Sequence, residues 1–321
     1  MQERLKKNIW LFLRITISAA LIFLLSRIFD LSTVPSLFRG VRPGFIALAL
    51  ILILLSVAVS TRKWFVLVRS QNIKAGYAEL FASYLTGLFF NNFLPSSVGG
   101  DAARAIAVGK KRGKIAEVAS SVIAERLIAM ASLALVGLAG SAFSRNRNPL
   151  ALILLAVVLV FALFVIAVLV SGWLPGPLRR GGGKLSRAIR DASGSARLLR
   201  DNPLSVARSF AGAVVFQIIV ALVMQSCLFA IGADQVPFAD IVFIASASSV
   251  LAMVPAGING YGLREGSYAI LLAPYGIGAS LAVSASLLFA FLVAGFSMTG
   301  LFTWLVSGRK VTSNIKEGQY A

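Results

Sequence analysis

Two polar stretches interrupt an otherwise apolar chain, and both contain residues that could bind an anion or carry a proton. The first reads NNFLPSSVGGDAAR over residues 91–104, and the second reads PAGINGYGLRE over residues 255–265. Each stretch has a proline, then a glycine five residues after the proline and an arginine nine residues after it. These residues are Pro95, Gly100 and Arg104 in the first stretch, and Pro255, Gly260 and Arg264 in the second. Helix N-termini and guanidinium groups together favour binding of a phosphate. The shared spacing predicts one structural device used twice.

The surrounding sequence is that of a membrane protein. The 321 residues are 58% hydrophobic, and several runs reach the roughly 20 apolar residues that cross a bilayer. The formal net charge is +19, but the basic residues cluster between apolar runs, as in cytoplasmic loops that face anionic lipid. The strand alternation of a membrane β-barrel is absent from the sequence. We therefore predict an all-α polytopic membrane protein that does not bind nucleic acid.

The content of cysteine and histidine excludes several kinds of chemistry. The single cysteine, Cys227, cannot form an internal disulfide or a multi-cysteine metal site. The chain has no histidine, which excludes a histidine proton relay, a Ser-His triad and a zinc site built on histidine. The phosphate-binding motif GxxxxGK[ST] is also absent. We expect no metal and no cofactor.

Six full spans and two re-entrant hairpins are expected to position the polar stretches. The spans are predicted at residues 9–29, 45–61, 115–143, 150–171, 211–231 and 279–307. The hairpins are predicted at 77–110 and 238–276, because a broken backbone survives at membrane depth only inside protein or beside water. The first repeat would then cover 1–148 and the second 149–321, with a basic cytoplasmic linker at 172–208.

Charge indicates how the hairpins lie. If each hairpin enters and leaves by one face, most of the 31 basic residues fall on the side of the N-terminus. A full crossing by the first hairpin would place Lys110, Lys111, Arg112 and Lys114 outside, against the positive-inside rule. We therefore expect a bacterial cytoplasmic membrane protein with both termini in the cytoplasm. Its halves would insert from opposite faces as an inverted repeat, a plan common in transporters.

Six charged residues are predicted to lie near the middle of the membrane. Counted from the ends of their predicted helices at about 1.5 Å of rise per residue, all six lie at a similar depth in a hydrocarbon core of about 30 Å. They are Asp101, Glu125 and Glu265, and Arg104, Arg126 and Arg264. Each unpaired charge would cost at least about 2.5 kcal/mol there, so we expect pairing. Two interpretations stay open: the pairs only hold the hairpins in place, or they form a site for a lipid headgroup.

Other residues are expected to serve packing or to face water. The glycines predicted at close helix contacts are Gly137, Gly140, Gly295 and Gly300. Cys227 is predicted to be a buried small residue, and Asp234 and Asp240 are predicted to be exposed charges.

Three motifs carry a resemblance to a known family. They are NNFLPSSVGGDAARA at 91–105, AERL at 124–127 and PAGINGYGLREG at 255–266. In these motifs the chain resembles the transmembrane domain of lysylphosphatidylglycerol synthases and its stand-alone, flippase-like relatives of the UPF0104 type. Many relatives have glycine after the first proline, where this chain has Ser96 and Ser97. The resemblance implies re-entrant helices and a role in moving lipids, including aminoacylated or glycosylated ones, between leaflets. We do not expect this chain to make lysyl-lipid, because it contains no segment large enough for the aminoacyl-transferase domain.

The motifs together name a candidate site for a lipid headgroup. Its expected members are Asn91, Asn92, Pro95, Gly99, Gly100, Asp101, Arg104, Glu125, Arg126, Asn259, Gly260, Arg264 and Glu265. The predicted function is a lipid translocase that passes a phosphate-bearing headgroup through a polar cavity at the midplane. Two alternatives stay open: a membrane-embedded transferase that acts on a lipid carrier, and a non-catalytic membrane partner of a glycosyltransferase. The expected partners are a phospholipid or polyprenyl-phosphate-linked lipid at the site, and anionic inner-leaflet lipid at the basic loops.

Overall fold

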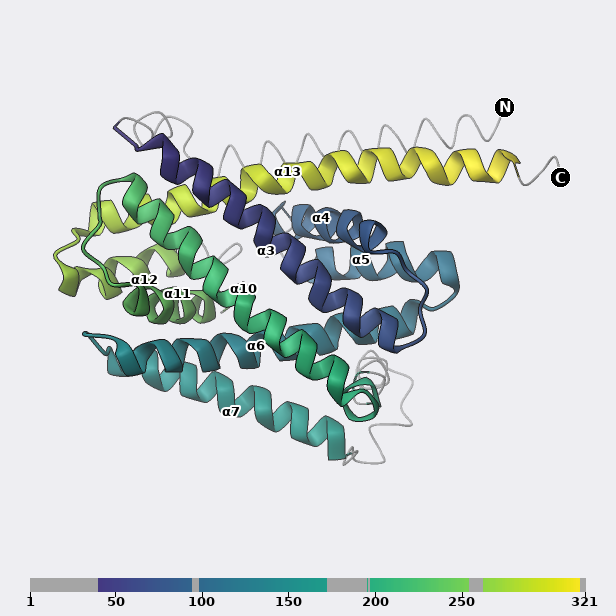
Figure 1. Ribbon diagram of the computed structural model, residues 1–321, viewed down its shortest axis with the longest axis horizontal. Helices are drawn as coiled ribbons and strands as arrows, with labels where there is room; N and C mark the ends of the chain where they lie inside the picture. Colours follow the sequence, from purple (N-terminus) through teal and green to yellow (C-terminus); the bar gives the residue numbers. More distant parts are fainter. Residues whose placement is uncertain (1–39, 94–97, 172–194, 196, 254–261, 318–321) are drawn as a thin grey trace.

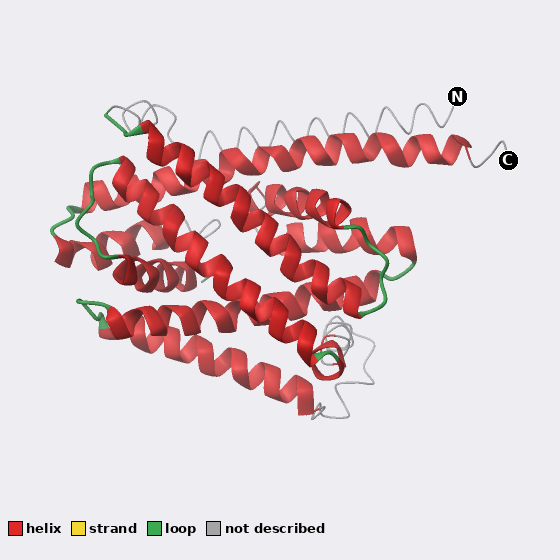
Figure 2. Cartoon of the chain, viewed as in Figure 1, coloured by secondary structure: helices red, strands yellow, loops and turns green. Residues whose placement is uncertain are grey.

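All regular elements in the described part of the chain are helices (Figure 1, Figure 2). The computed structural model describes residues 40–93, 98–171, 195, 197–253 and 262–317. The described helices long and apolar enough to cross a membrane are α3 (Pro43–Ser70), α6 (Ile115–Phe143), α7 (Pro149–Ser171), α10 (Pro203–Ala230) and α13 (Ala279–Glu317, apolar to Leu305). The predicted all-α polytopic fold is confirmed. The span predicted at residues 9–29 lies outside the described residues.

Two helices extend further than hydropathy predicted. α3 continues past the predicted end at residue 61 to Ser70, and α10 begins at Pro203 rather than at residue 211. The prediction ended α3 at its first basic residues, but Lys63 and Trp64 are buried against other helices and so remain in the helix. Proline at the first position of α10 starts that helix early, because its missing N–H group would have no partner there.

Four short helices lie between the long ones. They are α4 (Tyr77–Phe93), α5 (Val98–Gly109), α11 (Phe238–Ala252) and α12 (Leu263–Leu272). At about 1.5 Å per residue each is roughly 15 to 26 Å long, short of a core of about 30 Å. α4 contacts α5, and α11 contacts α12. The order long, short, short, long therefore occurs twice, in α3–α6 and in α10–α13, and the inverted symmetry stays a prediction.

Each pair of short helices ends in the same kind of turn. A 3₁₀ turn, η1 (Lys110–Arg112), follows α5, and η3 (Ala273–Tyr275) follows α12. The next residues, Gly113 and Gly276, have φ of 65° and 75°. Glycine adopts this left-handed conformation without steric cost, so it reverses the chain directly into the following helix.

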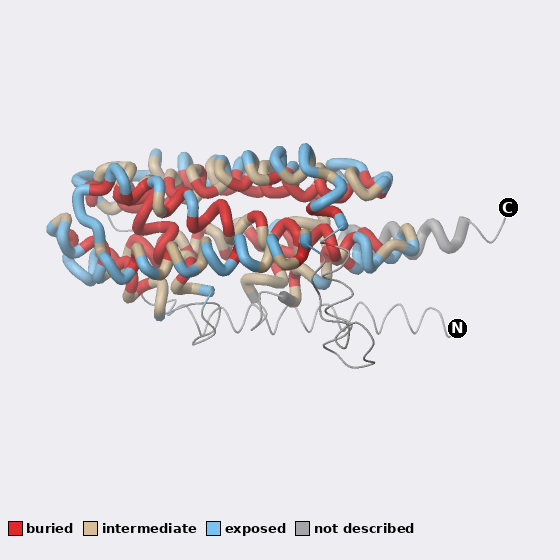
Figure 3. Tube along the Cα trace, turned by 90° about the horizontal axis from the view of Figure 1, so that it is seen from below, coloured by how far each residue is buried: buried red, intermediate tan, exposed pale blue. Residues whose placement is uncertain are grey.

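The helices form an elongated bundle with its buried residues inside (Figure 3). α3 lies along α10, α4 packs on α13, and α6 packs on α11 (Figure 1). The largest apolar core surrounds α11, where Phe243 and Ile244 meet Leu155 of α7, Met224 of α10 and Leu272 of α12. Of the short helices, α11 is therefore the one most fully enclosed by its neighbours.

Close helix contacts explain three of the four glycines predicted to serve packing. A Cβ atom on Gly137 would approach Ser246 of α11 to 2.6 Å, and one on Gly140 would lie 2.9 Å from a methyl group of Val242. A Cβ atom on Gly300 would overlap a backbone carbonyl of α4. The prediction was wrong for Gly295, which faces open space because it lies roughly 140° around α13 from Gly300. The predicted burial of Cys227 is confirmed.

An ion-pair group joins the two ends of the first hairpin, α4 and α5. Glu79, at the start of α4, accepts hydrogen bonds from Arg112 at 2.5 Å and from Lys111 at 3.3 Å, both in η1 after α5. Arg112 also donates to the backbone carbonyl of Lys74, ahead of α4. The start of α4 and the end of α5 therefore lie at one end of the bundle, as a hairpin requires.

The Glu79 group predicts a loss of stability on acidification. Burial alone would raise the pKa of Glu79, but the hydrogen bonds and charges of Arg112 and Lys111 outweigh burial and hold this pKa below its ordinary value of 4.5. A lowered pKa in the folded state adds stability that is complete above the ordinary pKa and is lost as pH falls below it. We expect the thermal unfolding midpoint in detergent to fall more between about pH 6 and about pH 4 for the wild type than for Glu79→Gln.

A matched control for this measurement is Glu117→Gln, because Glu117 is an exposed carboxylate in the first turn of α6. That variant should keep the wild-type pH response. An equal response of Glu79→Gln and the wild type would contradict the assignment.

Candidate functional site

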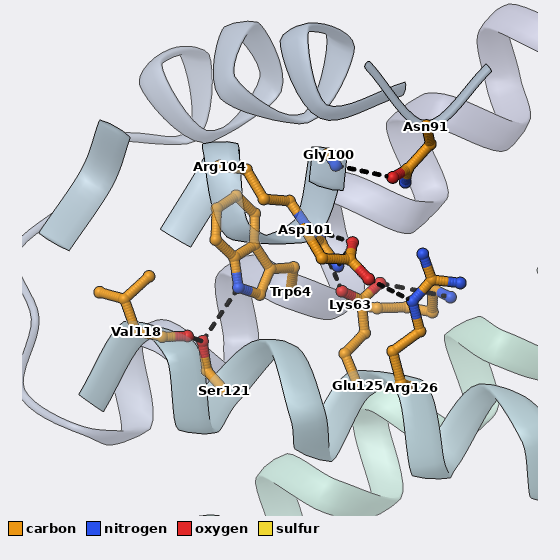
Figure 4. A network of polar contacts seen from close by, with 10 residues as sticks. All are labelled: Lys63, Trp64, Asn91, Gly100, Asp101, Arg104, Val118, Ser121, Glu125 and Arg126. Carbon is orange, nitrogen blue, oxygen red and sulfur yellow. Dashed lines mark hydrogen bonds and ion pairs between the residues drawn. The ribbon is translucent and has the colours of Figure 1, made fainter. Parts of the chain in front are cut away.

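Five charged side chains form a continuous network where α3, α5 and α6 meet (Figure 4). Its members, hereafter the charge network, are Lys63, Asp101, Arg104, Glu125 and Arg126. Glu125 accepts from Arg104 Nη1 at 2.7 Å and lies 3.7 Å from Lys63 Nζ. Asp101 accepts from Arg104 at 3.1 Å and from Arg126 Nε at 2.6 Å. Cation and carboxylate therefore alternate from Lys63 to Arg126.

Exposure changes along the network from one end to the other. The side chains of Lys63 and Arg104 are 4% exposed, that of Asp101 is 14% exposed, and that of Arg126 is 48% exposed. Three cations face two carboxylates, so one positive charge is left over. Because Arg126 is by far the most exposed cation, an incoming anion would meet the network at Arg126.

Helix geometry places these side chains. Asp101 lies in the first turn of α5, where the helix dipole favours a carboxylate, and Arg104 lies on the same helix face three residues later. Glu125 and Arg126 are consecutive in α6, so their side chains point roughly 100° apart. Glu125 is therefore turned inward to Arg104, and Arg126 is turned to the more exposed side of Asp101.

Aromatic rings hold the two buried cations. The guanidinium of Arg104 lies 4.7 Å from the ring centroid of Trp64 and 4.9 Å from that of Tyr84. Trp64 is held in turn by its indole N–H, which donates to Ser121 at 3.0 Å (Figure 4). Lys63 Nζ lies 4.8 Å from the ring of Phe216 on α10. Such cation–π contacts stabilise charges most where water is excluded.

Two glycines, Gly87 on α4 and Gly100 on α5, let these helices pack closely in the first hairpin. The backbone N–H of Gly100 donates to the side-chain oxygen of Asn91 at 2.9 Å, which satisfies one of the N–H groups left over at the start of α5. A Cβ atom on Gly87 would lie 3.0 Å from the carbonyl oxygen of Gly100, so the two glycines let α4 and α5 approach closely. The N–H of Gly100 is therefore used within the hairpin, and the place of Gly100 in a headgroup site stays a prediction.

A second charged pair begins α12. Arg264 lies 3.2 Å from Glu265, and its guanidinium is 5.7 Å from the ring of Phe289. Glu265 accepts from the backbone N–H of Gly262 at 2.5 Å and from the hydroxyl of Ser286, on α13, at 3.1 Å. The carboxylate thus caps α12 and joins it to α13.

The structure brings together four of the six charges predicted at the midplane. Asp101, Arg104, Glu125 and Arg126 belong to the charge network, whereas Arg264 and Glu265 form the pair at the start of α12. Of the other predicted site residues, Asn91 and Asn92 lie in the last turn of α4, and Gly99 and Gly100 lie in the first turn of α5. Pro95, Asn259 and Gly260 lie outside the described residues.

Sequence reasoning missed Lys63 and misplaced Asp240. Lys63 lies beyond the predicted span at 45–61, yet its side chain is buried in the charge network. The apolar pattern that resumes after it, through residues 64–68, was the available signal that α3 continues.

Asp240 was predicted to be exposed and is fully buried. It accepts hydrogen bonds from the hydroxyls of Ser144 and Tyr275 and, at 2.9 Å, from the backbone N–H of Arg145. Burial and the hydrogen bond to Asp240 raise the pKa of Tyr275 to about 12, so the phenol remains a donor. Asp240 is buried because the end of α6 and the turn η3 both pack over the start of α11. Asp234 is 47% exposed, as predicted.

The fold and the site define a polytopic α-helical membrane protein in which short paired helices hold a buried ion network. The chain belongs to the family described as the lysylphosphatidylglycerol synthase TM region, whose sequence pattern matches residues 11–299. It is also similar to a UPF0104 membrane protein of Methanothermobacter thermautotrophicus, with 29% identity over 176 residues that cover 48% of this chain and 52% of the relative. The chain thus spans about half the length of that curated relative. No solved structure matches the chain. Membership in this family supports a lipid-related role in the membrane.

Proposed function

We propose that this protein is a lipid translocase that passes a phosphate-bearing headgroup between the leaflets of a cytoplasmic membrane. The observation that carries the proposal is the surplus positive charge of the network, which is accessible at Arg126. Charges inside a membrane protein are costly and are generally retained for function. Balanced buried pairs can serve geometry alone, but the third cation of this network has no carboxylate to match it.

The free donors of Arg126 suit a phosphate. Its Nε donates to Asp101, and within the described residues no hydrogen bond or ion pair occupies its two Nη groups. These two groups carry four N–H donors in one plane, which match two oxygens of a phosphate. A headgroup would therefore be held at Arg126, next to the first turn of α5.

The carboxylates are placed to orient cations rather than to act as bases. Each oxygen of Glu125 faces a cation, Lys63 or Arg104, and each oxygen of Asp101 faces Arg104 or Arg126. A general base needs a lone pair within hydrogen-bonding reach of a substrate proton. This arrangement favours translocation over the alternative of a membrane-embedded transferase. The other alternative, a partner of a glycosyltransferase, depends on the linker at 172–208, most of which lies outside the described residues.

The absence of a nucleotide motif bears on the energy source. Without GxxxxGK[ST] in the sequence, the proposed movement would take its energy from an ion gradient, from a partner or from the gradient of the lipid itself. Alternating exposure of a site between two repeats is the mechanism that we propose, by analogy with transporters built from inverted repeats.

The test is the rate of lipid translocation by Arg126→Gln in proteoliposomes. We expect at least about a tenfold slower exchange of fluorescent phosphatidylglycerol between leaflets, because a hydrogen bond to a charged group is worth about 1.5 to 3 kcal/mol. The thermal midpoint should remain near that of the wild type, since Arg126 is half exposed. Arg147→Gln, at an exposed arginine beyond α6, should leave both quantities unchanged.

Full translocation by Arg126→Gln would exclude Arg126 as the headgroup contact. Mass spectrometry of the recovered lipid separates the alternatives, because a transferase would return a chemically altered lipid. Recovery of altered lipid in the wild-type reaction would overturn the proposal.

A further inference from the structure

A groove lies between α3 and α10, and one of its lining residues is Lys63, which also pairs with Glu125. The groove has a volume of about 310 Å³ and is lined by Val59, Arg62, Lys63, Val66, Arg208, Gly212 and Val215. This volume is at the lower end of the range of about 300 to 1,000 Å³ for small-molecule sites. The three valines offer water few hydrogen-bond partners, so the groove suits a hydrocarbon chain better than solvent.

The charges of the groove all have one sign. Arg62, Lys63 and Arg208 line it, and no acidic residue among those that the structure describes does. The ion pairs among the described residues include neither Arg62 nor Arg208. Both arginines are exposed. An apolar groove with two guanidiniums at its edge that form no ion pair among the described residues complements an acyl chain joined to an anion.

Helix length places the backbones of these arginines just inside the hydrocarbon core, where an arginine side chain can reach the lipid phosphates. α3 and α10 have 28 residues each. A helix of this length is about 42 Å long. If it is centred on the membrane, it extends about 6 Å beyond each side of a hydrocarbon core of about 30 Å. Arg208 lies about 8 Å from the start of α10, and Arg62 about 12 Å from the end of α3. Both side chains can extend toward the headgroups while their stems line the groove.

We propose that this groove binds an anionic glycerophospholipid, with an acyl chain along Val59, Val66 and Val215 and the phosphate between Arg62 and Arg208. The inference goes beyond the proposed function, because the groove would hold lipid whether or not the protein moves it. Lys63 belongs both to the lining of this groove and to the charge network. A Cβ atom on Gly212 would lie 2.7 Å from Cγ of Lys63, so glycine at this position leaves room for the lysine stem in the groove.

The test is photolabelling in vesicles of phosphatidylcholine that contain phosphatidylglycerol with a diazirine in its acyl chain. We expect label on residues 59–66 and 208–215, and at least fivefold less label there in the Arg62→Gln/Arg208→Gln variant. The matched control is Arg69→Gln/Arg200→Gln, which removes two exposed arginines of the same region outside the groove. Val215→Trp should also reduce labelling by filling the groove, whereas Leu204→Trp, at an exposed position of α10 outside it, should not.

Several results would overturn the inference. Equal labelling of the groove by diazirine phosphatidylcholine would show that the anionic headgroup is not recognised. No label on either segment would show that another occupant, such as residues 172–194 of this chain, fills the groove. Wild-type labelling of the Arg62→Gln/Arg208→Gln variant would exclude the phosphate contact. None of these substitutions touches Asp101, Arg104, Glu125 or Arg126, so a protein that labels normally but fails to move lipid would contradict only the proposed function.

Discussion

Replacing Arg104 with alanine is expected to destabilise the protein by about 3 to 5 kcal/mol, the usual loss when one partner of a buried ion pair is removed. Arg104 is 3% exposed and donates to both carboxylates of the charge network. Without it, Glu125 would keep only Lys63, at 3.7 Å, and Asp101 would keep only the half-exposed Arg126. The aromatic contacts with Trp64 and Tyr84 would be lost as well.

The measurement is the thermal unfolding midpoint in detergent, followed by size-exclusion chromatography of the heated protein. Arg126→Ala provides the matched control, because it removes a guanidinium from the same network at a half-exposed position and should shift the midpoint far less. Adding Glu125→Gln to Arg104→Ala should recover part of the loss, because the carboxylate left without its arginine is then neutral. Equal midpoints for Arg104→Ala and Arg126→Ala would contradict the buried role of Arg104.

Replacing Gly300 with alanine is expected to be the second most damaging change. The added Cβ atom would overlap the carbonyl oxygen of Leu85 and would lie 2.9 Å from Cβ of Phe89, both on α4. Backbone atoms cannot rotate away as a side chain can, so α4 would have to move off α13. Overpacking of this kind costs about 1 to 3 kcal/mol or more. Because α4 carries Asn91 and Tyr84, which contact α5, the shift should also reach the charge network.

Gly295→Ala is the control for this prediction on the same helix. Nothing described lies within 4 Å of an added Cβ atom there. Alanine should therefore be neutral, or stabilising by up to about 1 kcal/mol through its higher helix propensity. Thermal midpoints of the two variants and the wild type provide the comparison. A midpoint for Gly300→Ala at or above that of Gly295→Ala would show that α4 and α13 do not pack as closely as the structure has them.

Much of the fold could be predicted from the sequence because a membrane restricts the choices. A spanning segment must satisfy its backbone internally, so length and hydropathy alone indicate helices such as α6 and α7, whose predicted bounds agree with the structure within one residue. A charge in the apolar core must find a partner, so Asp101, Arg104 and Glu125 could be predicted to pair. The first polar stretch could likewise be recognised as the break between α4 and α5.

Only the tertiary structure decided which groups meet. Hydropathy gives neither the rotation of a helix about its axis nor the identity of its neighbours. For that reason the sequence did not reveal that Lys63 turns inward to Glu125, that Asp240 lies beneath Tyr275, or that Glu265 caps α12. The residues that can do chemistry were thus evident from the chain alone, because polar groups are conspicuous in an apolar sequence. Their partners, and the surplus charge left at Arg126, depend on how the helices pack.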